Sequence, residues 1–326
     1  MLPAANWTAM RRGRDRVRGA RRVGAFAGLA ILALTAWYAA ASASRAVTKP
    51  RVLAQVRVGS QPLGLTSGGG SIWAANYGSR EVARIDPGRN RVAARVSLNQ
   101  GVYGLAFGAG AIWVSAFDSP FLSRIDPATN RVVARIEVGM QQAEVTASST
   151  TVWVAVFGQG DVVKVDPATN RVVARIHVGG QPEEVIVAAG AAWVPNENGT
   201  VARIDLATNA VVAQIRVGAD PDYAVLCRGR LWVSSLRGPR ISLIDPARNR
   251  VVRQLKVGRG SAGIACGRSV WLANYDTGRL LRIDPGTRKV TGQIALGGQP
   301  RSVIVAARSV WVSNQRLGTV TRIRGG

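Results

Sequence analysis

Histidine and metal-binding motifs are nearly absent from this chain of 326 residues. Its single histidine, His177, excludes any site built on a histidine pair, and it leaves a serine nucleophile without a histidine base to activate it. The two cysteines form no CxxC or CxxCH motif, which excludes c-type haem attachment and argues against structural zinc. No Walker or dinucleotide-binding motif is present either; Gly68-Gly-Gly70 is expected to be a hairpin turn rather than a phosphate loop.

Acidic residues are also scarce. The chain has 18 Asp and Glu against 43 Lys and Arg, a net charge of +25. Such a charge suits anionic polymers, including lipid headgroups and nucleic acid, and binding of that kind would weaken steeply with salt. The arginines are spread through the chain, however, and from residue 51 onward no basic run is interleaved with aromatics. Nucleic acid is therefore not an expected partner.

Tryptophan, in contrast, recurs with a fixed period. Seven tryptophans follow one another at steps of 39 or 40 residues: Trp73, Trp113, Trp153, Trp193, Trp232, Trp271 and Trp311. A period near 40 indicates one structural unit copied in tandem, because a single copy cannot bury its own apolar face. A large ring at the same place in every copy is expected to fill the space between neighbouring sheets.

Each repeat contains four short apolar runs separated by turns. The copy at 180–217 has the runs EEVIVA, AAWVPN, TVARID and AVVAQIRV, which predict a four-stranded antiparallel meander. An IDPATN-like turn lies between the last two runs, and its aspartate is expected to form the turn rather than to act in catalysis. These aspartates are Asp86, Asp126, Asp166, Asp205, Asp245 and Asp284.

Seven such copies predict an all-β protein, a seven-bladed β-propeller of four-stranded antiparallel blades spanning 51–326. The last copy, 298–324, stops after its third strand, and a matching fourth strand precedes the first copy. We therefore expect residues 51–58 to close the last blade and to remove the open edge of the ring.

The motifs VWVSN, GTVTRID-like runs and DPATNRVVARIxVG resemble those of the YVTN family of β-propeller repeats, over 51–326. Repeat length and tryptophan placement are also similar to streptogramin lyases, which are seven-bladed propellers. That second resemblance implies paired histidines, a glutamate and magnesium. His177 cannot supply a pair, and it lies where other copies hold Arg57, Ser97, Glu137, Arg216, Lys256 or Ala295, so we expect it to be exposed on an outer strand.

The residues before the repeats have a different character. Residues 1–22 form a basic head, 23–43 carry no charge, and 44–50 form a short linker. The uncharged run is long enough to cross a bilayer as a helix, with the arginines keeping the N-terminus in the cytoplasm. Ala41-Ser-Ala43 also fits a signal-peptide cleavage site. Both interpretations place the propeller outside the cytoplasm, either anchored in the cell membrane or secreted.

Acidic residues gather in the loops that lead into three consecutive blades and in one neighbouring loop. This acidic sector consists of Glu144, Glu183, Glu184, Glu197, Asp220 and Asp222, with Tyr223 beside them. It predicts a ligand-binding site near the mouth of the channel for a cation, an amine or a basic peptide. Weakly bound Ca²⁺ or Mg²⁺ would suit its oxygen ligands; no other cofactor is expected. The alternative is that these acids pair with nearby arginines or face water.

Four aromatic residues follow their tryptophans by four positions: Tyr77, Phe117, Phe157 and Tyr275. They predict either packing between loops or a contact platform for a partner on the same face. Cys227 and Cys266 both lie five residues before a tryptophan in neighbouring blades. Equivalent positions on adjacent inner strands allow a disulfide in an exported protein, and two buried thiols are the alternative.

These features lead to two functional hypotheses. The main prediction is a non-enzymatic, membrane-anchored and monomeric propeller that binds a protein, peptide or glycan at the cell surface, since the chain is almost wholly repeat scaffold and lacks a base. The alternative is a metal-dependent lyase or hydrolase that uses the acidic sector and is related to streptogramin lyases without their histidine pair. Similarity of fold is its only support.

Overall fold

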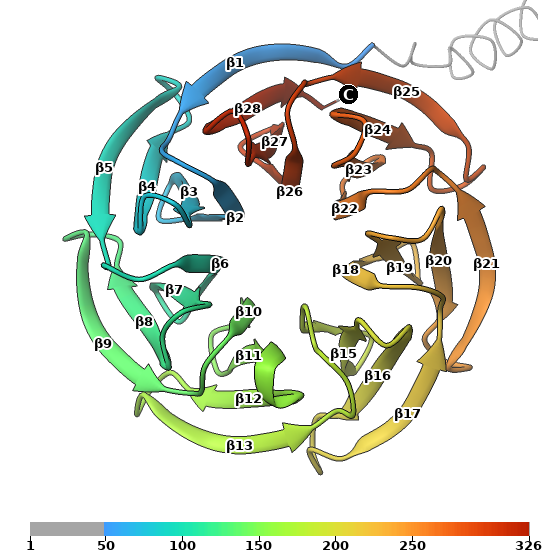
Figure 1. Cartoon of the computed structure of the whole chain (residues 1–326), viewed down its shortest axis with the longest axis horizontal. Coiled ribbons are helices and arrows are strands. Elements are labelled where there is room, and N and C mark those ends of the chain that lie inside the picture. The colour runs from blue at the N-terminus through green and yellow to red at the C-terminus, as the bar shows by residue number, and fades with distance from the viewer. Residues whose placement is uncertain (1–48, 326) are drawn as a thin grey trace, which may run out of the picture. The chain divides into compact units, whose positions relative to one another are not determined.

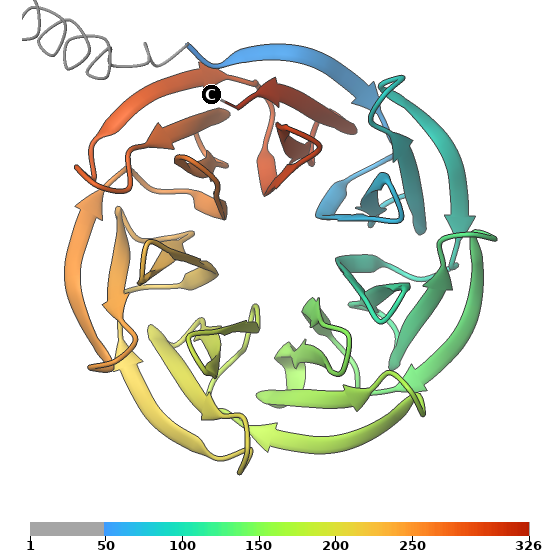
Figure 2. The same ribbon diagram turned by 180° about the vertical axis from the view of Figure 1, so that it is seen from behind.

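Residues 49–325 are described by a computed structural model. Seven four-stranded antiparallel sheets stand around a central axis as the blades of a propeller (Figure 1), and the same ring seen from behind is shown in Figure 2. The all-β, seven-bladed fold predicted from the sequence is confirmed. Among the described residues no helix has the length and apolar character needed to cross a membrane. The predicted segments 1–22 and 23–43, and 44–48 of the linker, lie outside the described residues.

The strands repeat in the same order in every blade. The innermost are β2 (Pro62–Gly68), β6 (Val102–Gly108), β10 (Gln142–Ala147), β14 (Ile186–Ala188), β18 (Pro221–Cys227), β22 (Ser261–Cys266) and β26 (Pro300–Ala306). The second strands are β3 (Ser71–Asn76), β7 (Ala111–Ala116), β11 (Val152–Val156), β15 (Ala191–Asn196), β19 (Arg230–Ser235), β23 (Val270–Asn274) and β27 (Ser309–Asn314). The third strands are β4 (Glu81–Asp86), β8 (Phe121–Asp126), β12 (Asp161–Asp166), β16 (Thr200–Asp205), β20 (Arg240–Asp245), β24 (Arg279–Ile283) and β28 (Thr319–Arg324). The outer strands are β5 (Arg91–Ser97), β9 (Arg131–Glu137), β13 (Arg171–His177), β17 (Val211–Arg216), β21 (Arg250–Lys256), β25 (Val290–Ala295) and β1 (Arg51–Arg57). One 3₁₀ turn, η1 (Phe157–Gln159), follows β11.

Blades are numbered from β2, so that β26, β27, β28 and β1 form blade 7. In that blade β1 pairs antiparallel with β28, from Arg51 opposite Arg324 to Arg57 opposite Thr319. The first strand of the domain thus completes the sheet of the last (Figure 1). This pairing joins the two ends of the domain and leaves no blade with a missing outer strand.

The seven tryptophan rings are buried, none of them more than 3% exposed. In five blades a cationic side chain on the third strand lies over the ring of its own blade, as Arg84 does at 5.2 Å from the Trp73 centroid. The same Arg84 reaches the turn of the next blade, where it donates to the Pro127 carbonyl at 2.7 Å and to the Asn130 side chain at 3.1 Å. This contact, here called the arginine clamp, ties neighbouring blades together in addition to their apolar packing.

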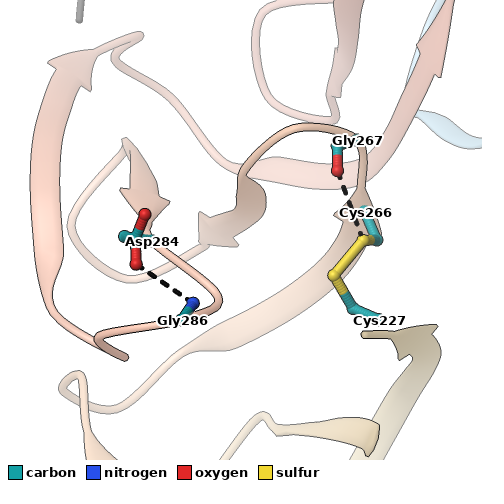
Figure 3. Close-up of a disulfide and its surroundings, with 5 residues drawn as sticks. All are labelled: Cys227, Cys266, Gly267, Asp284 and Gly286. Carbon is teal, nitrogen blue, oxygen red and sulfur yellow. Dashed lines mark hydrogen bonds between the residues drawn. A yellow bond between two sulfur atoms is a disulfide. The ribbon is translucent and has the colours of Figure 1, made fainter. Parts of the chain in front are cut away.

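The boundary between blades 5 and 6 is different. The position of the clamp cation is held there by Leu243, and the receiving turn has Arg288 where five other turns have asparagine. A disulfide joins these two blades, from Cys227 at the end of β18 to Cys266 at the end of β22, with 5.7 Å between the Cα atoms (Figure 3). Beside it, the Gly286 amide donates to Asp284 at 3.0 Å within the blade-6 turn (Figure 3).

Candidate functional site

The innermost strands share a recurring break in their pairing with the second strands. In six of the seven blades the pairing register between the first and second strands shifts, so that two residues of the first strand bulge out of the ladder. In blade 4 the strand is interrupted instead, and Pro182 forms an isolated bridge with Asn196 before β14 begins. A bulge releases two residues from strand alternation and re-aims their side chains. From blade 1 to blade 7 these residue pairs are Leu63-Gly64, Tyr103-Gly104, Ala143-Glu144, Glu183-Glu184, Asp222-Tyr223, Ala262-Gly263 and Arg301-Ser302.

Two bulge side chains from different blades meet at a buried arginine, which is itself the bulge residue of a third blade. Arg301 of blade 7 donates to both carboxylate oxygens of Asp222 in blade 5, at 3.0 and 3.3 Å. Its second terminal nitrogen also donates to the Tyr103 hydroxyl of blade 2 at 3.1 Å. Arg301 is 8% exposed and Asp222 is 3% exposed, so the pair is shielded from water. A bidentate contact of this kind fixes the plane of the guanidinium group as well as its position.

A second pair of contacts joins the neighbouring bulges. The Tyr223 hydroxyl donates to Glu144 at 2.6 Å, and the Ala224 amide donates to Glu184 at 2.6 Å. The Arg301 guanidinium lies 5.6 Å from the centroid of the Tyr223 ring. These contacts connect blades 3, 4, 5 and 7, so the bulges form one network rather than seven separate features.

Above this network lies a pocket of about 450 Å³ with a polar floor and aromatic walls. The floor comes from the bulges, through Leu63, Tyr103, Glu183 and Arg301. The walls are the residues that follow six of the seven tryptophans by four positions, together with one loop residue: Tyr77, Phe117, Phe157, Leu236, Tyr275, Gln315 and Gln61. The corresponding residue after Trp193 is Glu197, which lines a different cavity. Phe117 packs between Tyr103 and Phe157, with ring centroids 6.0 and 6.3 Å apart.

Burial shifts the acid–base properties of the carboxyl groups here. It is the main cause that raises the pKa of Glu183 to about 8, that of Glu144 to about 7 and that of Asp222 to about 6. The Arg301 charge opposes all three shifts, while Asp222 adds to the shift of Glu183. Burial likewise raises the pKa of Glu184, which lies partly buried beside these groups. Such carboxyl groups exchange protons near neutral pH, as acid–base catalysts do.

The predicted acidic sector divides into two places. Glu144, Glu184, Asp222 and Tyr223 belong to the network, on bulges of the inner strands rather than on open loops, and Glu183 lies in the pocket floor. Glu197 and Asp220 line a separate cavity of about 700 Å³, where Asp220 lies 3.4 Å from Nε of Arg237. The predicted aromatic row lines the pocket. His177 is exposed on β13 and lies 3.0 Å from Asp161.

Sequence analysis missed Tyr103 and Arg301. Both occupy the same bulge position as Glu183 and Asp222, in the segments QGVYG and GQPRS. Comparing that single position across the seven copies gives Leu, Tyr, Ala, Glu, Asp, Ala and Arg. An arginine in a row that also holds two acids was the signal that could have revealed the ion pair.

Comparison with known structures supports the fold. A chain of hydrazine synthase from Kuenenia stuttgartiensis has a TM-score of 0.74 to this chain at 16% sequence identity, and the match covers 87% of this chain and 99% of that one. At this identity the likeness shows the fold alone. The glutamine cyclotransferase family model matches residues 64–199, which hold Tyr103, Glu144, Glu183 and Glu184. The comparison with curated proteins found no match.

The family match corrects the main functional prediction. A glutamine cyclotransferase model points to an enzyme, so the prediction of a non-enzymatic binding scaffold is wrong, and the alternative prediction of an enzyme agrees better with the match. The error came from equating the lack of histidine with the lack of a base. Buried carboxyl groups with pKa values of about 7 and 8 can fill that role. The assignment to YVTN repeats or to streptogramin lyases stays a prediction.

Among residues 49–325, no group of three or more His, Cys, Asp or Glu side chains is arranged to hold a metal ion. The weak Ca²⁺ or Mg²⁺ binding expected from the acidic sector stays a prediction.

Proposed function

We propose that the pocket is the active site of a cyclotransferase that closes a glutamine side chain onto its own α-amino group. The family match over 64–199 and the pocket's acid–base groups support this proposal. In the reaction, the α-amino nitrogen attacks the side-chain amide carbon, a five-membered lactam forms, and the amide nitrogen leaves as ammonia. The substrate is either free glutamine or a glutaminyl group with a free α-amine.

Glu183 carries the proton transfer in this proposal. Its pKa of about 8 is close to the range of about 7.7–8.0 for an α-amino group, so a proton moves between them at little cost. The carboxylate takes a proton from the α-ammonium group, which frees the nitrogen to attack. That first proton passes on to water. During the attack Glu183 takes a second proton from the same nitrogen and passes it to the departing amide nitrogen, so ammonia leaves, the lactam nitrogen keeps one hydrogen, and Glu183 is regenerated as a carboxylate.

Arg301 and Tyr103 stabilise the oxygen that becomes negative during the attack. Three of the five N–H groups of Arg301 are used by Asp222 and Tyr103, which leaves two donors for a substrate oxygen. Burial raises the pKa of Tyr103, so its hydroxyl keeps its proton. Donors that are already fixed at a site shielded from water stabilise a developing charge more than mobile water does. The aromatic walls pack against the rest of the substrate.

The test measures whether the full-length protein converts glutamine and a short panel of glutaminyl dipeptides. Turnover is detected as released ammonia and as the loss of the mass of ammonia from the substrate. Glu183→Gln should lower kcat by about 10²- to 10⁴-fold, since that is the usual contribution of a general base. Glu137→Gln, which changes an exposed acid on the outer strand β9, should have little effect. No turnover by the wild-type chain, or equal turnover by both variants, would overturn the proposal.

We also propose that the propeller acts outside the cytoplasm. The basic residues 1–22 and the uncharged residues 23–43 support export, and so does the Cys227–Cys266 disulfide, which persists in oxidising compartments. Protease accessibility of the propeller on intact cells tests this proposal, and protection from protease would contradict it.

A further inference from the structure

Three blades share a feature that the other four lack. In blades 2, 5 and 7 the last residue but one of the second strand is a serine, namely Ser115, Ser234 or Ser313. The same position holds Ala75, Ala155, Pro195 and Ala273 in the other blades. Blades 2, 5 and 7 are also the ones whose bulges supply Tyr103, Asp222 and Arg301.

Each serine hydroxyl binds the bulge of its own blade. Ser115 accepts a hydrogen bond from the Gly104 amide, Ser234 from the Tyr223 amide, and Ser313 from the Ser302 amide, each at 2.9 Å. These amides belong to the residues that directly follow Tyr103, Asp222 and Arg301. The register shift takes them out of the strand ladder, so without the hydroxyl a buried N–H group would need another partner.

Two of the serines also reach the next blade. Ser313 donates to the Leu63 carbonyl of blade 1 at 2.6 Å, and Ser115 donates to the Ala143 carbonyl of blade 3 at 2.5 Å. Ser234 donates to the Tyr223 carbonyl of its own bulge at 3.2 Å. All three side chains are fully buried. A hydroxyl group that accepts a hydrogen bond from the bulge of its own blade and donates one to the bulge of the next blade has a fixed orientation. It therefore holds the backbone of both bulges in place.

We propose that Ser115, Ser234 and Ser313 are positioning residues that fix the bulges of Tyr103, Asp222 and Arg301 so that these three side chains meet in the active site. The contact of Arg301 with Asp222 and Tyr103 consists of hydrogen bonds of 3.0 to 3.3 Å between side chains from three blades. The backbone at each bulge must therefore be held within a fraction of an ångström. The consequence for catalysis rests on the function proposed above, whereas the consequence for the geometry of Arg301 does not.

Replacing each serine with alanine tests the proposal. Alanine stands at this position in three other blades, so the variants are expected to fold. Each change should lower kcat/KM by about tenfold or more while KM changes less, because small misplacements of groups that act in the reaction have effects of this size. Ser242→Ala is the matched control: this serine is 2% exposed, and its hydrogen bonds go to the Val217 carbonyl at 2.8 Å and the Gln254 side chain at 3.1 Å, neither of which is a bulge residue.

A second measurement does not depend on turnover. The Arg301 charge lowers the pKa of Glu183, against the opposing effects of burial and of Asp222, Glu197 and Asp220. If Ser313→Ala lets Arg301 move, the pKa of Glu183, followed by NMR of labelled glutamate carboxyl groups in the full chain, should rise. Ser313→Thr, which keeps the hydroxyl, and Ser242→Ala should both leave it at the wild-type value.

The two proposals fail in different ways. A wild-type chain without turnover, combined with a raised pKa of Glu183 in Ser313→Ala, would reject the cyclotransferase and keep the positioning role. An unchanged pKa of Glu183 in a folded Ser313→Ala variant would overturn the positioning role, whatever the activity. Equal losses of kcat/KM in Ser313→Ala and Ser242→Ala would also overturn it, because the effect would then be one of general stability.

Discussion

Arg301 of blade 7 and Asp222 of blade 5 form a bidentate ion pair between two blades that are not neighbours, although 79 residues separate them in the sequence. Both groups are almost completely buried. The pair therefore links blades 5 and 7, and at the same time it holds the guanidinium group at the floor of the pocket.

Breaking this pair should destabilise the protein strongly. We expect Asp222→Ala to lower the free energy of unfolding by about 3–5 kcal/mol, because Arg301 would be left buried without its counter-charge. Arg80→Ala is the control, since the Arg80–Asp118 pair is exposed and such pairs contribute about 1 kcal/mol or less. Urea unfolding measures both, and similar losses in the two variants would show that burial of the Arg301 pair has no special effect.

Stability should fall as the pH rises from about 5 to about 8. The carboxyl groups of Glu183, Glu144 and Asp222 have pKa values raised to about 8, 7 and 6 in the folded chain, so there they bind protons that the unfolded chain has already released. A group of this kind stabilises the fold below its unfolded pKa, and that stability is lost as the pH passes through the folded pKa. Thermal unfolding measured across this range checks the sign, and a midpoint that rises with pH would contradict it. Glu183→Gln should flatten the upper part of the curve.

The fold could be predicted from the sequence because its determinants are local and repeated. Each Trp and each Asp turn specifies the same packing in every copy, and the structure shows the turn carboxylates bound by backbone amides, as in Gly88 to Asp86 at 2.8 Å. The site depends instead on how the copies differ and on which copies face each other. The contacts between Tyr103, Asp222 and Arg301 follow from ring closure and from the bulges, and neither Tyr103 nor Arg301 stands out in its own segment. The acidic sector was visible from composition, but its protonation was not, because burial sets it.

The aromatic walls should govern substrate affinity more than the chemical step. Phe117→Ala and Phe157→Ala should each raise KM by about tenfold for a glutaminyl substrate with an apolar neighbouring group, with a smaller change in kcat. The reason is that these rings line the pocket above the polar floor and bury apolar surface of the substrate. Phe107→Ala is the control, since Phe107 lies 38% exposed on β6 and outside the pocket. Steady-state kinetics with substrates that differ only in that neighbouring group provide the measurement, and equal KM values for all variants would contradict the expectation.

The disulfide should replace the arginine clamp that is missing between blades 5 and 6. We expect Cys227→Ala with Cys266→Ala to lower the free energy of unfolding by about 3–4 kcal/mol, as for a bridge that closes a loop of 39 residues.

Adding Leu243→Arg and Arg288→Asn to that double variant supplies the cation and the turn residue found at the clamped boundaries. This change should restore about 1 kcal/mol through stacking on Trp232 and bonding to the turn. Chemical unfolding of the wild type, the double variant and the quadruple variant tests both steps, and no recovery in the last would show that the clamp cannot be transferred.

Ring closure should be essential for solubility. Deleting 51–58 removes β1 and the buried side chains of Val56 and Val58, and it exposes the whole edge of β28. An unpaired edge of six residues can pair with another chain, so the deleted protein should aggregate or form dimers, as measured by light scattering. The control replaces 51–57 with the β9 sequence RVVARIE, which carries the same inward-facing pattern, and this variant should stay monomeric. A peptide of residues 51–58 added to the deleted protein should bind the open edge and reduce aggregation, because backbone pairing supplies most of its affinity. A deleted protein that stays soluble and monomeric without the peptide would show that β1 is not required to close the ring.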